Sequence, residues 1–192
     1  LGLADNTLSF FSSDNGPSRE SRNWLDGKQD PYYGGKTGML RGNKFSLFDG
    51  GIKLPAIMHW PGKIPSQQVS SEVCASMDVV PTILEAVGID YSNLKIDGKS
   101  LLPHLINGKK MPDREIFWEM QNQKAVRKGK WKLVLNGQLV ENEPKVSNVH
   151  LANLESDPGE RINLADKETE VKEELMHILN QWTENIENEW EN

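Results

Sequence analysis

The end of the chain constrains the fold most strongly, because it predicts an amphipathic helix that must lie on an apolar surface. From residue 168 to 187, apolar side chains recur at spacings of three and four: Val171, Leu175, Ile178, Leu179, Trp182 and Ile186. Such a stripe occupies one face of a helix, and packing of that face supplies most of a helix's stability in a protein. We therefore expect a helix over residues 168–187 that lies across a neighbouring sheet.

The sheet itself is predicted from short apolar runs in the preceding sequence. These runs lie at residues 116–118, 125–127, 131–135 and 149–151. Lys128-Gly129 falls between two of them, where a tight hairpin turn belongs, and such turns join antiparallel strands. Residues 113–192 are therefore expected to form a small C-terminal subdomain, an antiparallel sheet with a terminal helix.

The first part of the chain, residues 1–112, has a different pattern of predicted strands and helices. A strand at 8–12 runs into a turn-forming loop, and a second strand follows at 56–60. Asp78 as N-cap and Gly88 as a stop bound a helix. Its apolar residues fall on one face: Val79, Val80, Ile83, Leu84 and Val87. The order strand, loop, strand, helix predicts part of an α/β layered domain.

The composition fits a globular protein and limits its partners. The chain has 192 residues, 26% of them charged, and a formal net charge of −6. This acidic balance, without a Lys/Arg cluster, argues against nucleic acid as a partner. No uninterrupted apolar stretch of about 18 residues exists, so no membrane span is predicted. Leu1 is not an initiator methionine, and we expect the chain to belong to a longer protein.

Neither the cysteine nor the histidines predict a reactive site. Cys74 is the single cysteine, so it cannot form an internal disulfide, and we expect it to be buried near the start of the helix that follows. The histidines have no metal-ligand spacing, and none is assigned an acid–base role: His59, His104, His150 and His177.

Asp14 and Asn15 are the first candidates for a functional site. They follow the strand at 8–12, and α/β sheets bind ligands outside the carboxyl ends of their strands. A carboxylate and an amide oxygen are hard donors suited to Ca²⁺ or Mg²⁺. The alternative is that Asp-Asn-Gly at 14–16 is only a turn sequence.

Lys44 is the second candidate. It lies in residues 18–53, which are polar, glycine-rich and without helical or strand period, and this indicates a long loop, either structured or disordered. A lysine in such a loop can meet an oxyanion as a compact point charge; the alternative is a solvated surface lysine. Trp24, Tyr32 and Tyr33 in the same loop could stack on a sugar or aryl group, or could anchor the loop by packing.

Six sequence blocks in a fixed order carry a resemblance to a known family. They read Phe-Ser-Ser-Asp-Asn-Gly at 11–16, Leu-Arg-Gly-Asn-Lys at 40–44, Phe-Asp-Gly-Gly-Ile-Lys-Leu-Pro at 48–55, His-Trp-Pro-Gly at 59–62, Met-Asp-Val-Val-Pro-Thr-Ile-Leu at 77–84 and Leu-Glu-Ser-Asp-Pro-Gly-Glu-Arg-Ile-Asn-Leu-Ala at 154–165. The series resembles the carboxyl-terminal half of type I sulfatases, within the alkaline phosphatase superfamily. The resemblance covers nearly the whole chain.

The resemblance implies a fold and a set of site residues. Residues 1–112 would be the C-terminal portion of an alkaline-phosphatase-like α/β domain, followed by the small subdomain. Asp14 and Asn15 match two ligands of the family's calcium ion, with Mg²⁺ as the alternative ion. Lys44 matches the lysine that contacts the substrate sulfate. The family usually has Glu where this chain has Asp49, and no role is assigned to Asp49.

The family's nucleophile has no counterpart in this sequence. Type I sulfatases use a formylglycine made from Cys or Ser within a Cys/Ser-x-Pro-x-Arg motif, whereas Cys74 is followed by Ala-Ser-Met-Asp. The formylglycine, the catalytic histidine and the first pair of metal-binding aspartates are therefore expected upstream of the chain. The strands at 8–12 and 56–60 would then lack neighbours, and a self-sufficient fold would need an oligomer or a rearrangement.

Three functions are compatible with these residues. The leading hypothesis is hydrolysis of a sulfated carbohydrate or aryl sulfate by the complete protein, in a periplasmic or secreted location, with this fragment inactive by itself. The second is a phosphoesterase of the same superfamily, against which Asn15 argues, because such relatives usually have His there. The third is a non-catalytic binding or assembly module.

Overall fold

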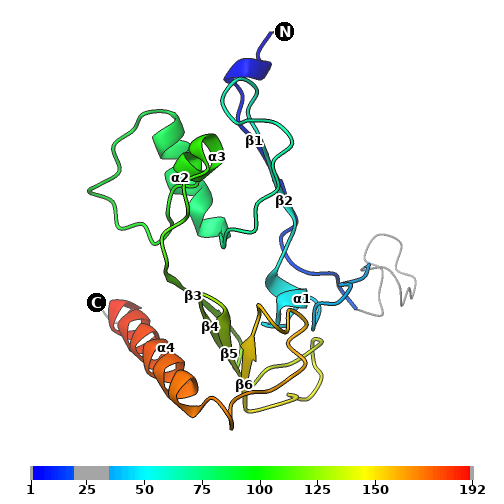
Figure 1. Ribbon diagram of the computed structural model, residues 1–192. Helices are drawn as coiled ribbons and strands as arrows, with labels where there is room; N and C mark the ends of the chain where they lie inside the picture. Colours follow the sequence, from blue (N-terminus) through cyan, green and yellow to red (C-terminus); the bar gives the residue numbers. More distant parts are fainter. Residues whose placement is uncertain (1, 20–34, 191–192) are drawn as a thin grey trace. The chain divides into compact units, whose positions relative to one another are not determined.

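The computed structural model describes residues 2–19 and 35–190, and the chain divides into two compact units (Figure 1). Unit 1 consists of Leu1–Ser12 and Ala56–Asp113, and unit 2 consists of Ser13–Pro55 and Arg114–Asn192. The segment Ser13–Pro55 thus packs with the C-terminal sheet. The predicted boundary at residue 112, which concerns the domains of the longer protein, stays a prediction.

Unit 1 contains a two-stranded antiparallel ribbon. β1 (Ser9–Ser12) pairs with β2 (Ala56–His59), with Ser9 opposite His59 and Ser12 opposite Ala56. The expectation that these strands lack neighbours is wrong, because each is the partner of the other. A short 3-10 turn, η1 (Ala4–Asn6), precedes the ribbon.

The helical part of unit 1 begins and ends where the sequence indicates. η2 (Ser76–Asp78) leads into α2 (Val79–Ala86), Gly88 follows with φ +73°, and α3 (Leu102–Asn107) comes later. Asp78 is the residue before α2, but its carboxylate does not cap that helix. It accepts hydrogen bonds from the backbone N–H groups of Ala75 and Lys99, both at 2.8 Å.

One burial prediction for unit 1 is wrong: Cys74 is exposed, although it lies close to the helix start as predicted. Part of the apolar face of α2 is exposed as well, since Val80 is 54%, Ile83 47% and Val87 63% accessible, whereas Val79 and Leu84 are half-buried. Local sequence does not decide burial, because burial depends on which surface covers a residue.

Unit 2 contains a four-stranded antiparallel sheet in the order β3-β4-β5-β6. The strands are β3 (Glu115–Met120), β4 (Gln123–Lys128), β5 (Trp131–Leu135) and β6 (Val149–Asn153). Lys128 pairs with Trp131, so a two-residue turn at Gly129-Lys130 joins β4 to β5. Gly129 has φ +55°, a conformation that costs glycine little, and the predicted hairpin is confirmed.

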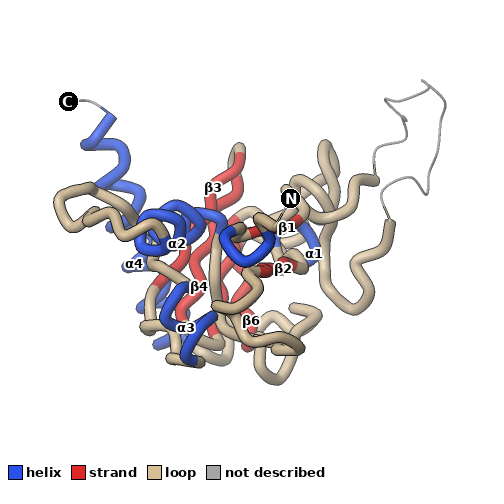
Figure 2. The backbone as a smooth tube through the Cα atoms, turned by 90° about the horizontal axis from the view of Figure 1, so that it is seen from above, coloured by secondary structure: helices blue, strands red, loops and turns tan. Residues whose placement is uncertain are grey.

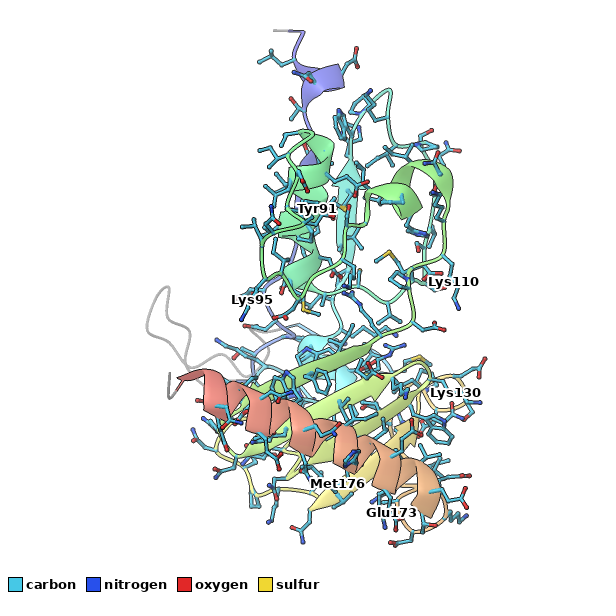
Figure 3. All side chains as sticks on the ribbon, turned by 90° about the vertical axis from the view of Figure 1, so that its left-hand side faces the viewer. Tyr91, Lys95, Lys110, Lys130, Glu173 and Met176 are labelled. Carbon is cyan, nitrogen blue, oxygen red and sulfur yellow. The ribbon has the colours of Figure 1, made fainter. Side chains whose placement is uncertain are left out.

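One face of this sheet is covered by the terminal helix α4 (Thr169–Trp190), as predicted. Figure 3 shows α4 in front of the strands, with Met176 and Glu173 labelled on it. The buried cluster between helix and sheet consists of Val126, Leu133, Leu151, Ala165, Leu175 and Leu179. Phe117 and Trp182 stack beside it with ring centroids 4.9 Å apart. Removal of this apolar surface from water holds α4 on the sheet.

The opposite face of the sheet is covered by the loop at 41–48 and by α1 (Asp49–Ile52). Leu47 and Phe48 pack there against Ala125 and Val134. Apart from these elements, much of the chain runs as loops and turns, drawn tan in Figure 2. Within the described ranges, no helix is both long enough and apolar enough to cross a membrane.

Candidate metal and sulfate site

Three segments that are separate in the sequence meet in unit 2. Gly16 donates its backbone N–H to the carbonyl of Gly51 in α1 at 2.8 Å, and Lys44 donates its backbone N–H to the carbonyl of Pro17 at 3.0 Å. In Figure 1 the blue segment that follows β1 runs beside the cyan helix α1. The loop with Asp14 and the loop with Lys44 are therefore docked on each other and on α1.

Glycines make this docking possible, because the backbones touch directly. A Cβ atom on Gly16 would overlap the carbonyl oxygen of Gly50, and a Cβ on Gly50 would overlap the carbonyls of Arg41 and Gly42. Gly50 also donates its N–H to the carbonyl of Arg41 at 2.6 Å. Close backbone approach of this kind requires glycine. It explains why the Asp-Asn-Gly and Asp-Gly-Gly blocks carry glycine where they do.

Asp14 and Asn15 directly precede Gly16, the residue that bonds to α1. Asp14 is exposed, and its Oδ1 accepts a hydrogen bond from the backbone N–H of Asn15 at 3.0 Å. Asn15 is half-buried, and its Nδ2 donates to the carbonyl of Gly16 at 2.9 Å, which fixes the side-chain amide with Oδ1 on the other side. The two side chains are thus adjacent hard oxygen donors, which fits a calcium or magnesium ion.

The described residues supply only part of a metal site. Over 2–19 and 35–190 there is no group of three or more His, Cys, Asp or Glu side chains arranged to hold an ion. Calcium takes six to eight oxygen ligands, so Asp14 and Asn15 need further donors. The expectation that other ligands come from upstream of the chain stays a prediction.

Lys44 lies in a strained loop that the sheet supports. Its Nζ is 5.4 Å from the ring centroid of the next residue, Phe45, whose φ is +70°. Such a conformation costs a non-glycine residue about 1–3 kcal/mol and persists only where surrounding contacts impose it. Gln123 of β4, which is buried, donates its Nε2 to the carbonyl of Phe45 at 2.8 Å and accepts from the N–H of Leu47 at 3.4 Å.

A buried charge cluster lies under α1, and sequence reasoning missed it. Lys132 of β5 is completely buried, with Nζ 2.6 Å from Asp49 Oδ1 and 3.0 Å from Glu160 Oε1. Glu160 Oε2 accepts the backbone N–H of Asp49 at 2.6 Å. Asp49, to which no role was assigned, therefore has a buried ionic partner. The one available signal was Lys132 at an inward position of a strand whose other residues are apolar.

Electrostatics at this cluster follow from its burial. Burial raises the pKa of the Glu160 carboxyl, and the nearby Lys132 ammonium opposes that shift. Burial lowers the pKa of the Arg41 guanidinium, whose Nη1 donates to the Glu160 carbonyl at 2.7 Å. Burial, helped by Arg41, lowers the pKa of His150 to about 4. His150 is thus neutral at pH 7, edge-on to the ring of Phe48 at 5.1 Å.

The other histidines, to which no role was assigned, have surroundings of their own. His104 is held in unit 1, where Ser70 Oγ lies 2.8 Å from Nε2 and the Lys109 carbonyl lies 2.8 Å from Nδ1. His59 and His177 are exposed. The three loop aromatics discussed above lie outside the described residues: Trp24, Tyr32 and Tyr33.

Comparison with known proteins identifies the family and the fold. The sulfatase family model matches residues 1–89. Bovine (Bos taurus) arylsulfatase A is 32% identical over 94% of this chain and 38% of its own length. Human (Homo sapiens) N-acetylgalactosamine-6-sulfatase is 40% identical over 62% of this chain and 21% of its own length. A structure from a study of glycosaminoglycan metabolism by Bacteroides thetaiotaomicron has a TM-score of 0.73 and 25% identity, covering 93% of this chain and 39% of that one.

The chain belongs to the sulfatase family. The resemblance to type I sulfatases and the predicted α/β fold with a small antiparallel sheet and terminal helix are confirmed. The chain spans about 38% of the length of the arylsulfatase A relative that it matches.

Proposed function

We propose that the protein of which this chain forms part hydrolyses the sulfate ester of a sulfated sugar or an aryl sulfate. Two relatives support this substrate class by name, one as an arylsulfatase and one as an N-acetylgalactosamine-6-sulfatase. The observation that carries the proposal is the docking of the Asp14–Asn15 loop and the Lys44 loop on the same short helix. The three residues proposed as metal ligands and as the sulfate contact therefore belong to one unit.

Asp14 and Asn15 would provide two ligands of a calcium ion, or of magnesium as the alternative. The Asp14 carboxylate brings negative charge, and the Asn15 amide brings an oriented neutral oxygen. When bound, such an ion supplies a strong local positive charge toward which an anionic substrate is drawn. The formylglycine nucleophile and the remaining ligands would come from upstream sequence.

Lys44 would contact a sulfate oxygen. Sulfate keeps its negative charge at neutral pH, and further charge passes to the leaving alcohol as the S–O bond breaks. A fixed ammonium group stabilises that charge without having to reorganise at the moment of reaction. The strained loop around Phe45 and its support by Gln123 hold the lysine backbone in a set position.

The test is turnover of a chromogenic aryl sulfate by the full-length protein, matured by a formylglycine-generating enzyme. Lys44→Ala is expected to lower kcat by about 10²–10³-fold, the range for loss of one charge-stabilising donor. The control is Lys130→Ala. Lys130, labelled in Figure 3, lies in the β4–β5 turn with its side chain 51% accessible, and its loss should leave kcat within about twofold.

The same assay separates the competing functions. Wild-type rates in Lys44→Ala would remove this residue from the site. Turnover of an aryl phosphate but not of an aryl sulfate would favour the phosphoesterase. Absence of turnover with both the aryl sulfate and the aryl phosphate, together with binding of a sulfated oligosaccharide, would favour a non-catalytic module. The periplasmic or secreted location belongs to the same proposal and is checked by cell fractionation.

A further inference from the structure

Three charged side chains are buried together between β5, α1 and the turn at 157–160. Lys132 and Glu160 are fully buried and Asp49 is nearly so. Lys132 Nζ contacts one oxygen of each carboxylate, at 2.6 and 3.0 Å. Buried charges are costly unless they are paired, and Lys132 is the buried partner of both carboxylates, whereas the exposed Lys53 reaches Asp49 Oδ2 only at 3.9 Å. Loss of Lys132 would therefore remove the ammonium group that contacts both carboxylates.

The cluster is directly connected to the backbone on which the candidate site rests. Asp49 is the first residue of α1, and the two glycines after it receive the neighbouring loops. Gly50 donates to the carbonyl of Arg41, and Gly51 accepts from the N–H of Gly16, next to Asn15. Moving Asp49 would shift both contacts at once.

Glu160 supplies a second connection, on the side of the lysine loop. Its carboxylate accepts the backbone N–H of Asp49 at 2.6 Å. Its carbonyl accepts the Arg41 guanidinium at 2.7 Å, and Arg41 also stacks 4.5 Å above the Phe48 ring. Since Arg41 begins the short segment that ends in Lys44, the cluster also fixes the base of that segment.

We propose that Lys132, Asp49 and Glu160 form a charge clamp that positions the Asp14–Asn15 loop relative to Lys44. They are positioning residues and do not touch the substrate. The effect of the clamp on catalysis rests on the proposed function of Asp14, Asn15 and Lys44. The C-terminal sheet would then contribute to the geometry of the active site through Lys132, in addition to stabilising the fold.

The test compares Lys132→Met with Leu175→Ala in the full-length protein. Leu175 belongs to α4 and is buried against the other face of the same sheet, so its truncation destabilises the subdomain without touching the clamp. The first measurement is hydrogen exchange at the Gly16, Gly50 and Gly51 amides, at a temperature where circular dichroism shows both variants folded. The second is the calcium dissociation constant from calorimetry with the ion alone.

Lys132→Met is expected to speed exchange at these three amides by at least about tenfold and to weaken calcium binding by about 10–100-fold, the effect typical of removing a residue that orients metal ligands. Leu175→Ala should leave both quantities near wild type. Equal exchange and equal calcium affinity in the two variants would overturn the clamp.

A second variant keeps the proposal testable if Lys132→Met does not fold. Asp49→Asn keeps the side-chain shape and the Lys132–Glu160 pair, and removes only the charge beside the glycines. It should change exchange and calcium affinity in the same direction by a smaller factor; wild-type values for both would count against the clamp. Absence of sulfatase turnover in the wild-type protein would reject the proposed function, whereas the exchange difference would still report on the clamp.

Discussion

His150 lies at the edge of the charge clamp and is held in its neutral form. It is 3% accessible, and Arg41 Nη1 lies 3.5 Å from both ring nitrogens. Burial and the adjacent guanidinium lower its pKa from 6.5 to about 4. In the unfolded chain the imidazole regains its ordinary pKa, so between these two values the unfolded state binds more protons.

The resulting prediction is a loss of stability on acidification from pH 6.5 toward 4. A folded-state pKa below the unfolded value makes the free energy of unfolding fall as pH decreases through this window, by roughly 1–3 kcal/mol from His150. Urea unfolding at pH 7, 6 and 5 measures it, provided that the variant His150→Gln is measured in parallel.

The parallel variant is needed because Glu160 acts in the opposite direction. Its raised pKa means that acidification protonates the folded state first, which favours folding. The wild-type minus His150→Gln difference isolates the histidine. A difference that stays constant from pH 7 to 5 would contradict the assigned environment of His150.

At the scale of elements, the contact between the loop at 13–17 and α1 decides whether the site forms. This contact is made by backbone atoms, and a side chain on Gly16 would separate the two segments. The packing of α4 on the other face of the sheet cannot replace this lost contact, because it involves different residues.

In the full-length protein, Gly16→Ala is therefore expected to weaken calcium binding by at least about tenfold. It should also lower the free energy of unfolding by about 1–3 kcal/mol, as overpacking typically does. Gly38→Ala is the control. Gly38 has φ +63° but open space around it, so alanine there costs only backbone strain of about 1 kcal/mol. Calorimetry and urea unfolding measure both effects, and equal calcium affinity in the two variants would show that the loop adapts.

At the scale of the whole molecule, unit 1 exposes large apolar side chains on two elements, α2 and the two-stranded ribbon. They are Phe10, Phe11, Ile57, Val80, Ile83 and Val87. Single exposed apolar residues are common at protein surfaces, so exposure of these side chains by itself does not define a binding surface.

The 192-residue chain by itself is expected to bind calcium with a dissociation constant above about 1 mM, because two side-chain ligands fall well short of the ion's requirement. Calorimetric titration of the chain with calcium chloride measures this, with Asp14→Ala as the comparison. Micromolar binding that is lost in Asp14→Ala would show that the chain completes the site unaided.

Local pattern in the sequence was sufficient for the strands and the terminal helix of unit 2, but not for α1, which lies in a segment where no helical period was found. The spacing of Leu175, Leu179 and Trp182 predicted α4, and Gly129 predicted the β4–β5 turn. Such features depend on residues a few positions apart, so they can be read without the rest of the fold. The six ordered blocks likewise identified the family, and with it the candidate roles of Asp14, Asn15 and Lys44, which stay predictions.

Only the tertiary structure decided which residues are buried and which distant residues contact each other. The apolar face of α2 follows the helical period yet is partly exposed, whereas Lys132 is the kind of residue usually found at the surface and is fully buried. Its partner Asp49 lies 83 positions away along the chain. The free energy of a buried charge depends on such distant partners. The sequence by itself therefore determined α2, α4, the hairpin turn and the family, while three-dimensional packing decided the charge clamp and the docking of the two loops.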